Sequence, residues 1–438
     1  MNFLLESYGC QMNSAESAAM ERHLARSGWQ RCSECTEADL VIINTCSVRA
    51  TAEQRILGRL ALYAAKKREH PFAVLVTGCA AATIPETLLS GGADYVMPPE
   101  EKHRLTQILA EVESASQEHS AVSTPDGLFA ENHYREGEPS ALVPVMHGCD
   151  NFCSYCIVPY ARGREVSRPW QAIGAEIDFL AEKGVREITL LGQNVCAYRA
   201  AADGQSPEAA DFAGLVRAAA RRVEGGPIRW VRFLSAHPKD FSDGLIAALA
   251  ENRCFCRHIH LPVQHGADIM LAAMNRRYTR AAYIELTRKL RAALPDLTLS
   301  TDILTGFPGE TAADFEQILT LMDEVRFTDA FMYHYNPRAG TAAYSLPNRV
   351  PEEVKRRRLA RVIALQRQHT KAALEAALGQ ERLVLAEKVS RKNEAELLCR
   401  SEHDEMCVVE ATPSHVGTFL TVRLTALNGN TYKAAVLD

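Results

Sequence analysis

Short apolar runs alternate with helical segments along most of this chain, and this alternation constrains its fold more than any other feature. From residue 141 onward the candidate strands are ALVPVMH, EITLLGQ, WVRFLS, HIHLPVQ, LTLSTDILTGF and DAFMYHY. The segments between them, such as GAEIDFLAEKG and AAYIELTRKLRAALP, have helical periodicity. Repeated βα units predict a parallel sheet with helices on its outside, in a full or an open barrel.

Three apolar runs near the start of the chain each lead to a cysteine. FLL leads through ESYG to Cys10, LVIINT leads to Cys46, and AVLVTG leads to Cys79. Such runs between helical segments predict buried parallel strands in an α/β sheet. Since sites in open α/β sheets form at the carboxyl ends of the strands, we expect these three cysteines to converge. Cys32 and Cys35 also have CxxC spacing, but they stand in a polar stretch without a second pair, and we interpret them as incidental.

The chain changes character twice. Residues 114–140 are polar, contain Pro and Gly and lack periodicity, which predicts a domain boundary. From about residue 375 short strands follow at hairpin spacing, with NGN as a turn signal, which predicts a small β-barrel. We therefore expect an α/β domain over residues 1–114, a linker over 115–138, a barrel core over 139–371 and a small β-barrel over 375–438.

Composition limits the possible partners. The net charge of −5 gives no general attraction to nucleic acid, so an RNA partner would need a local basic patch. Residues 349–371 carry eight lysines and arginines against two glutamates, although this could equally be the solvated face of a helix. The tail, residues 381–438, has seven basic against nine acidic residues.

No apolar run approaches the ~18 residues that span a bilayer, and the first residues lack a secretion signal, so we expect a cytoplasmic protein without membrane contact. Thiols in that compartment are kept reduced. The thirteen cysteines therefore predict metal or catalytic use, rather than disulfides, wherever they cluster.

The densest cluster lies directly after the first strand of the predicted barrel. The stretch HGCDNFCSYC holds Cys149, Cys153 and Cys156 in a CxxxCxxC pattern. Cysteine-only ligation points to zinc or iron–sulfur, but a structural zinc site wants four ligands and no fourth is near. Three thiolates on a cubane leave one iron without a protein ligand, and that iron can bind a substrate.

This loop, placed after the first strand of a βα barrel, resembles the radical S-adenosylmethionine (SAM) superfamily, and Tyr155 before the third cysteine suits that pattern. The resemblance implies that Cys149, Cys153 and Cys156 hold a 4Fe-4S cluster. Its open iron would bind the amino and carboxylate groups of SAM, and one electron from the cluster would cleave SAM to a 5′-deoxyadenosyl radical.

Further motifs narrow the resemblance to the methylthiotransferase family. These are YGCQMNSAES, INTCSVR, TGCAA, FCSYCIVPYARGREVSRP, EITLLGQNV, SAHPKDFSD, HIHLPVQHGAD, AMNRRYTR and TDILTGFPGET, in that order. In that family the first three motifs ligate a second, auxiliary cluster, here through Cys10, Cys46 and Cys79. The tail is similar to the family's RNA-binding TRAM barrel. The resemblance thus implies two 4Fe-4S clusters, with one SAM methylating sulfur on the auxiliary cluster and a second supplying the radical.

The family's branches differ in their targets. YGCQMN and LLGQNV resemble the branch that adds a methylthio group to carbon two of N6-dimethylallyladenosine beside the tRNA anticodon. Other branches act on threonylcarbamoyl-adenosine of tRNA or on an aspartate of a small-subunit ribosomal protein. Two positions depart from the first branch: Cys196 stands where Asn is usual, and His265 where Ser is usual, as in the protein-modifying branch.

Polar residues that follow the later barrel strands are further candidates for the site. Gly192, Gln193 and Asn194 stand where the superfamily recognises the SAM amino group and backbone. Gln264 and Asp302 would face the ribose or the target base. The alternative is that all five only complete hydrogen bonds at strand ends.

Other residues have simpler expected roles. His147 and His265 are expected to be packed and hydrogen-bonded, with a role as proton carriers as the alternative. GFPGET, residues 306–311, predicts a tight turn with Glu310 and Thr311 capping the next helix. Residues 355–361 and 275–280 are the expected phosphate contacts, and a flipped target base would enter the barrel mouth.

A different class of hypothesis is an iron–sulfur protein that binds RNA or carries electrons without turnover. Open irons argue against a carrier, which gains nothing from them. We expect a monomer that acts on the anticodon loop of tRNA. The electron donor and the sulfur donor are not identifiable from the sequence.

Overall fold

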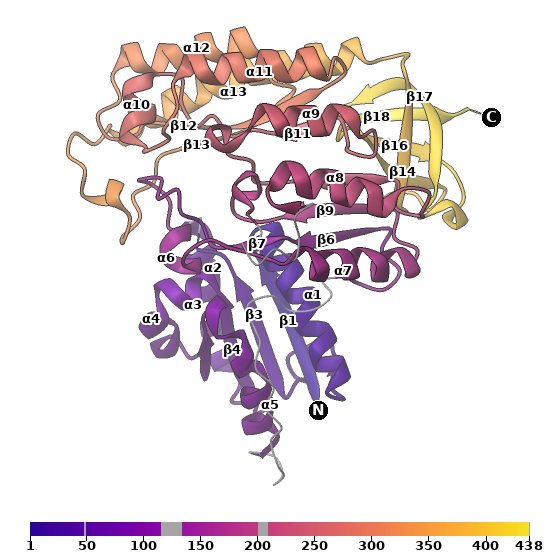
Figure 1. The fold of residues 1–438 in the computed structure, drawn as a ribbon. Coiled ribbons are helices and arrows are strands. Elements are labelled where there is room, and N and C mark those ends of the chain that lie inside the picture. The colour runs from indigo at the N-terminus through magenta and orange to yellow at the C-terminus, as the bar shows by residue number, and fades with distance from the viewer. Residues whose placement is uncertain (48–49, 115–133, 200–208, 438) are drawn as a thin grey trace. The chain divides into compact units, whose positions relative to one another are not determined.

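The computed structural model describes residues 1–47, 50–114, 134–199 and 209–437. Most of the predicted linker, residues 115–133, lies outside these ranges. The chain forms two compact units (Figure 1). The first unit comprises Met1–Arg135, Leu142–Phe152 and Cys156–Arg168, and the second comprises Glu136–Ala141, Cys153–Tyr155 and Pro169–Asp438. No helix in the described ranges is long and apolar enough to cross a membrane.

The first unit is built on a five-stranded sheet in the order β2-β1-β3-β4-β5, and its strand pairs are parallel. The strands are β1 (Asn2–Tyr8), β2 (Gln30–Arg31), β3 (Leu40–Thr45), β4 (Ala73–Gly78) and β5 (Tyr95–Met97). Alternate residues of β3 face opposite sides: Leu40 and Ile42 join one apolar cluster, Val41 and Ile43 the other. Both faces of the sheet are therefore buried, which explains the unbroken apolar run of β3.

Helices cover this sheet and connect its strands. They are α1 (Gln11–Arg26), α2 (Ala50–Lys66), α3 (Cys79–Thr83), α4 (Pro85–Ser90), η1 (Pro99–Arg104) and α5 (Leu105–Ser114). The first unit also contains the short pair β7 (Met146–His147) and β8 (Val166–Ser167), and helix α6 (Val158–Arg162), which packs against α3. Part of the cysteine loop thus belongs to the same unit as the amino-terminal sheet.

An open barrel has most of its strands in the second unit, while β6 is divided between the two units. One sheet has the order β10-β9-β6 and the other β11-β12-β13. Val231 of β10 also forms a parallel bridge with Phe255, which lies just before β11. The strands are β6 (Ser140–Pro144), β9 (Glu187–Leu191), β10 (Trp230–Phe233), β11 (His258–His260), β12 (Thr298–Thr305) and β13 (Asp329–His334). The described pairs β9–β10, β11–β12 and β12–β13 are parallel, which confirms the predicted βα architecture.

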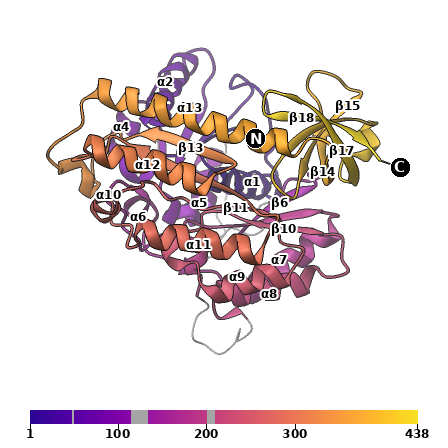
Figure 2. The ribbon, with the colours of Figure 1, turned by 90° about the horizontal axis from the view of Figure 1, so that it is seen from above.

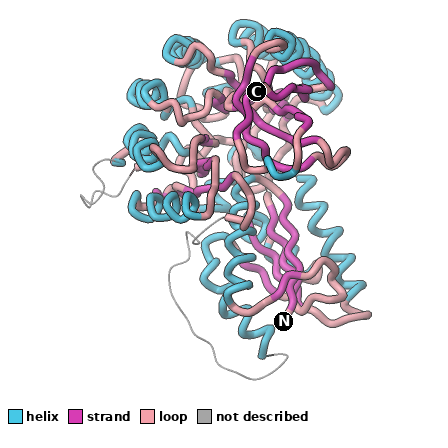
Figure 3. The backbone as a smooth tube through the Cα atoms, turned by 90° about the vertical axis from the view of Figure 1, so that its right-hand side faces the viewer, coloured by secondary structure: helices cyan, strands magenta, loops and turns pink. Residues whose placement is uncertain are grey.

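Helices succeed one another on the outside of these strands (Figures 2 and 3). They are α7 (Trp170–Glu182), α8 (Phe212–Val223), α9 (Asp243–Glu251), α10 (Asp268–Ala273), α11 (Arg280–Ala293), α12 (Ala312–Val325) and α13 (Glu352–Ala376). Helix α13 packs along β13 and leads directly into the tail. The α/β fold class predicted from the alternating runs is confirmed.

The tail forms a closed five-stranded barrel in the order β14-β15-β16-β18-β17. Its strands are β14 (Glu381–Val389), β15 (Glu396–Ser401), β16 (Met406–Glu410), β17 (Phe419–Asn428) and β18 (Thr431–Val436). The predicted NGN turn joins β17 to β18, with Gly429 at a φ of 61°. Closure leaves no open sheet edge, and alternate residues fill the interior of this tail barrel.

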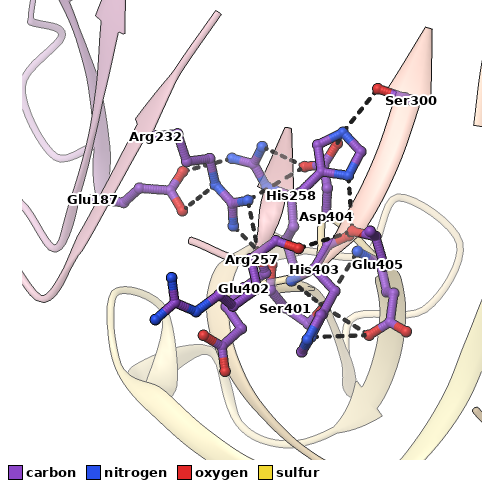
Figure 4. Close-up of polar contacts among 12 residues, drawn as sticks. Glu187, Arg232, Arg257, His258, Ser300, Ser401, Glu402, His403, Asp404 and Glu405 are labelled. Carbon is purple, nitrogen blue, oxygen red and sulfur yellow. Dashed lines mark hydrogen bonds and ion pairs between the residues drawn. The ribbon is translucent and has the colours of Figure 1, made fainter. Parts of the chain in front are cut away.

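Buried ion pairs fasten the tail barrel to the open barrel (Figure 4). Arg232 on β10 donates from Nε to Glu187 Oε2 at 2.8 Å and from Nη2 to the carbonyl oxygen of Ser401 at 2.7 Å. Arg400 donates to the other oxygen of Glu187 at 2.9 Å. Glu187 begins β9. The tail barrel therefore covers the amino ends of the barrel strands, opposite the ends where site residues gather in this fold.

Candidate functional site

The three cysteines of the first unit stand at the carboxyl ends of neighbouring parallel strands. Tyr8 pairs with Thr45, and Thr45 pairs with Gly78, so the strands end in register. Cys10 is the N-cap of α1, Cys46 follows β3, and Cys79 begins α3. The structure therefore brings Cys10, Cys46 and Cys79 to one edge of the sheet.

Two glycines allow this close approach. A Cβ at Gly9 would lie 2.4 Å from Cys46 Cβ, and one at Gly78 would lie 2.2 Å from the carbonyl oxygen of Thr45. Gly78 also has a φ of 88°, which side chains other than glycine rarely adopt. Both positions need a residue without a side chain because the strand ends converge there.

The environment favours a thiolate at this edge. The pKa of Cys10 is lowered to about 6, first by a hydrogen bond with Cys46 and then by the positive charge of Arg162. Burial raises the pKa of Cys79, and Arg162 opposes that rise. Thiolates are the form that binds iron, so the donor set fits a metal cluster.

Arg162 of α6 is a buried residue that motif reasoning missed. Its Nε donates to Cys79 Sγ at 3.2 Å, and Nη1 and Nη2 donate to the two oxygens of Glu16 at 2.8 and 3.2 Å. Lys102 lies 2.8 Å from the same carboxylate. Arg162 is only six positions after Cys156, and that closeness to the cysteine loop was the available signal.

The CxxxCxxC loop is held at its first cysteine and again between its second and third cysteines. In the first unit, the N–H of Cys149 donates to the carbonyl oxygen of Gly163 at 3.2 Å. Gly148 has a φ of 75°, and a Cβ at this position would clash with the backbone of Arg164. In the second unit, Ser154 donates from Oγ to the carbonyl oxygen of Ala273 at 2.8 Å. The loop is therefore held by Gly163, which is close to it in sequence, and by Ala273, which is distant in sequence.

Cys153 has its own buried arginine. Arg276 Nη1 lies 3.3 Å from Cys153 Sγ, while Nη2 donates to the carbonyl oxygen of Pro262 at 2.8 Å and Nε to Tyr278 Oη at 3.0 Å. We expected residues 275–280 to contact phosphate. For Arg276 that expectation is wrong, because its guanidinium is buried, with the residue 3% exposed, and points at a cysteine.

The loops after β9 and β10 contain buried polar atoms that no described residue satisfies. They are Gln193 Oε1, Asn194 Oδ1 and His237 Nε2. Asn194 Nδ2 donates to Asp240 Oδ2 at 2.7 Å, which fixes the amide so that its oxygen is free to accept. Buried acceptors normally have a donor. The two amide oxygens are acceptors of the kind that an ammonium group, such as that of the methionine part of SAM, requires, whereas the Asp240 carboxylate is already paired with Lys239.

Gln264, which follows β11, meets Asp302, which lies within β12 rather than at its end. Gln264 Nε2 donates to Asp302 Oδ2 at 3.2 Å, and His260 Nε2 lies 3.5 Å from Asp302 Oδ1. Gln264 has a φ of 69°, which is uncommon for a residue with a side chain and marks a constrained position. This trio offers donors and an acceptor to a polar ligand.

The GFPGET turn differs from expectation at one residue. Thr311 caps α12 in a capping box with Asp314, as predicted. Glu310 does not cap the helix. It is buried, accepts the N–H of Gly306 at 2.7 Å, and contacts His265 Nε2 at 3.1 Å and Arg358 Nη1 at 2.5 Å. His265 is thus packed and hydrogen-bonded, as expected, and its departure from the family pattern is accommodated by Glu310.

The basic segment of α13 is also partly structural. Lys355 donates to the carbonyl oxygen of Tyr335 at 2.9 Å and is buried, as is Arg358. The prediction that residues 355–361 form a phosphate footprint is therefore wrong for Lys355 and Arg358. Arg356 and Arg357 are exposed and keep that role as a prediction.

Several other cysteines occupy structural positions. Cys196 is buried, and burial raises its pKa to about 12. Cys399 and Cys407 are paired across neighbouring strands inside the tail barrel as free thiols. Cys32 and Cys35 pack on an apolar cluster of the first unit. Thiols in such places behave as small apolar side chains.

Within the described ranges, no three His, Cys, Asp or Glu side chains are arranged around a single metal ion. A single ion needs thiolates at about 2.3 Å from one point. A cubane spreads its thiolates over separate irons, so this finding concerns mononuclear sites.

Comparisons with known proteins identify the relatives of this chain. Residues 143–322 match the radical SAM superfamily, and residues 2–97 match the uncharacterized protein family UPF0004. A solved radical S-adenosylmethionine methyltransferase, TsrM from Kitasatospora setae, has a TM-score of 0.58 at 15% identity, covering 78% of this chain and 73% of that one. At that identity the likeness concerns the fold alone.

Full-length relatives share one name, tRNA-2-methylthio-N(6)-dimethylallyladenosine synthase. The relative from Treponema pallidum is 45% identical over 100% of this chain and 99% of its own length. Those from Geobacter metallireducens and Syntrophotalea carbinolica are 41% and 37% identical, and each covers at least 95% of both chains.

Proposed function

This chain belongs to the tRNA-2-methylthio-N6-dimethylallyladenosine synthase family of radical SAM enzymes, and we propose that it adds a methylthio group to carbon two of N6-dimethylallyladenosine beside the anticodon of tRNA. It is a transferase that uses SAM and a 4Fe-4S cluster. The target bond is an aromatic C–H without useful acidity. Acid–base catalysis cannot break it, so the cofactor must supply a radical.

The observation that carries the proposal is the presence of two separate three-cysteine sets, each with a buried arginine beside one sulfur. Cys10, Cys46 and Cys79 would hold a sulfur-delivering cluster, with Arg162 beside Cys79. Cys149, Cys153 and Cys156 would hold the SAM-cleaving cluster, with Arg276 beside Cys153. When bound, these groups supply a carbon-centred radical and the sulfur to be transferred.

The residues of the barrel would bind and orient the small ligands. The free oxygens of Gln193 and Asn194 would accept hydrogen bonds from the SAM ammonium, with Gly192 allowing close approach. Gln264 and Asp302, already hydrogen-bonded to each other, would face the ribose or the target base. These assignments are inferred from position and unsatisfied polarity.

The tRNA would be held by exposed basic residues. Arg356 and Arg357 are exposed on α13, which runs into the tail barrel. Phosphate contacts of this kind set the position of an RNA without reading its sequence. A target base in a single-stranded loop is flipped at lower cost than one in a duplex. We place the reaction in the cytoplasm, where tRNA is found, and propose a monomer.

Nucleoside mass spectrometry tests the proposal. It compares tRNA from a strain in which this gene is deleted with tRNA from the same strain complemented with the gene. We expect the methylthio group to disappear from prenylated adenosine and to return on complementation. Loss of methylthio from threonylcarbamoyl-adenosine, or from a ribosomal-protein aspartate instead, would contradict the substrate. Absence of 5′-deoxyadenosine after anaerobic reconstitution with SAM would favour an electron carrier.

A further inference from the structure

Arg162 occupies an unusual place in the first unit. It is 4% exposed, and it contacts two residues from the amino-terminal sheet domain although it follows the CxxxCxxC loop in sequence. Its guanidinium is held on one side by both oxygens of Glu16 and donates on the other side to Cys79 Sγ. A bidentate pair of this kind fixes the plane of the guanidinium, so the direction of Nε–H toward sulfur is set by Glu16.

The charges around this arginine do not cancel. Glu16 is 5% exposed and contacts both Arg162 and Lys102, so two positive groups share one carboxylate. Those two cations hold the pKa of Glu16 well below its usual range despite burial. A buried positive charge without full compensation is costly, unless it faces a negative group. As a ligand of iron, Cys79 would be a thiolate and would supply such a group.

Hydrogen bonds and positive charge near cluster sulfurs make a cluster easier to reduce, because they stabilise the extra electron. Cys79 is one of the three proposed ligands of the auxiliary cluster. We propose that Arg162, oriented by Glu16, is a positioning residue that holds the Cys79 sulfur in place and raises the reduction potential of the auxiliary cluster. This inference rests on the proposed function, since it requires that cluster to exist.

A purely structural role of Arg162 would have different consequences for stability and for the cluster potential. If Arg162 only joined α6 to α1, its loss would lower the stability of the apoprotein, and the cluster in any surviving folded protein would keep its potential. The pair Arg31–Glu21 provides a matched control, because Arg31 is exposed and belongs to the same unit, and the half-buried Glu21 lies on α1 like Glu16. Arg31 lies outside the proposed cluster site.

The experiment uses the full chain with Cys149, Cys153 and Cys156 changed to alanine, so that only the auxiliary cluster can bind. Iron content is measured first, followed by the midpoint potential from a redox titration monitored by electron paramagnetic resonance. We expect Arg162→Gln to lower the ratio of reduced to oxidised cluster about tenfold at a fixed potential, which corresponds to about 59 mV for one electron.

Two further variants make the result specific. Glu16→Gln keeps an acceptor for the guanidinium but removes the negative charge. The reduction potential of the auxiliary cluster should therefore rise in this variant, whereas it falls in Arg162→Gln. Arg162→Lys keeps the charge and should give a smaller shift than Arg162→Gln, which preserves the test if the glutamine variant fails to fold. Arg31→Gln should leave both iron content and potential unchanged.

The outcomes separate this inference from the proposed function. If the background variant with three alanines binds no iron, the auxiliary cluster itself is absent and both fail. If it binds a cluster whose potential is the same in the background variant, in Arg162→Lys and in Arg162→Gln, the inference alone is overturned. Shifts of equal sign in Arg162→Gln and Glu16→Gln would also overturn it.

Discussion

Arg276 Nη1 donates a hydrogen bond to Cys153 Sγ over 3.3 Å, and the same guanidinium is held by Tyr278 and by the carbonyl oxygen of Pro262. The described contacts of Arg276 include no carboxylate, whereas Arg162 has Glu16. Among its described contacts, the buried guanidinium of Arg276 therefore faces the Cys153 sulfur without a carboxylate partner. This fits a site that holds an anionic cluster.

Replacing Arg276 should weaken SAM cleavage. A hydrogen bond to a charged group contributes about 1.5–3 kcal/mol, so Arg276→Gln should slow formation of 5′-deoxyadenosine by about tenfold to a hundredfold. Arg277→Gln is the matched control, because Arg277 is adjacent in sequence and hydrogen-bonds at the surface. The rate is measured after anaerobic reconstitution with dithionite. Equal rates for Arg276→Gln and Arg277→Gln would refute the role of Arg276.

Gln193 should contribute to SAM affinity. Gln193→Leu keeps a similar volume and removes the free Oε1 acceptor, so the dissociation constant for SAM should rise about tenfold or more. Equilibrium dialysis with labelled SAM measures it on the cluster-loaded protein. Iron content should stay unchanged, since Gln193 is outside both cysteine sets. An unaltered affinity would mean that the oxygen faces no ligand.

The tail barrel should depend on Glu187 for its attachment. Glu187 is 1% exposed and receives hydrogen bonds from Arg232 and Arg400. Glu187→Gln leaves the buried guanidinium of Arg232 without its close carboxylate partner, whereas Arg400 keeps Glu387. Such a loss costs about 3–5 kcal/mol of unfolding free energy. The exposed pair Arg222–Asp178 is the control, and Asp178→Asn should cost no more than about 1 kcal/mol. Urea unfolding of both variants provides the comparison.

Because of His258, the free energy of unfolding should fall in mild acid. Burial lowers the pKa of His258 to about 4, an effect opposed by Asp404. Its unfolded pKa is about 6.5. Between these values the unfolded chain binds one more proton than the native protein, so stability present above pH 6.5 is lost as the pH falls toward 4, at up to about 1.4 kcal/mol per unit. His258→Gln should reduce that slope between pH 6.5 and 5, and an unchanged slope would contradict the assignment.

Strand positions and strand ends were accessible from sequence because they follow local patterns. LVIINT and AVLVTG became β3 and β4, and parallel pairing then placed Cys46 and Cys79 side by side. The same logic brought Gln264 beside β12, but the prediction that Asp302 ends its strand is wrong, because β12 continues to Thr305. Alternation of apolar runs is a short-range signal, and the convergence of strand ends follows from it.

Long-range side-chain contacts could not be predicted from the sequence. Arg162 meets Cys79 across 83 positions of sequence and Arg276 meets Cys153 across 123, and nothing local indicates either pairing. The prediction that Lys355 and Arg358 of helix α13 contact phosphate failed for a related reason. The helix has polar residues all round, so periodicity did not reveal that Lys355 and Arg358 lie on its buried side. Only the packing of β13 and the GFPGET turn against that side shows it.

The division of labour between the two cysteine sets is the central claim, and one paired assay tests it most directly. Cys79→Ala and Cys153→Ala are each reconstituted with SAM and prenylated tRNA, and 5′-deoxyadenosine and methylthio product are quantified together. Cys79→Ala should still cleave SAM but form no methylthio product, and Cys153→Ala should do neither. Methylthio product from Cys79→Ala would contradict the account.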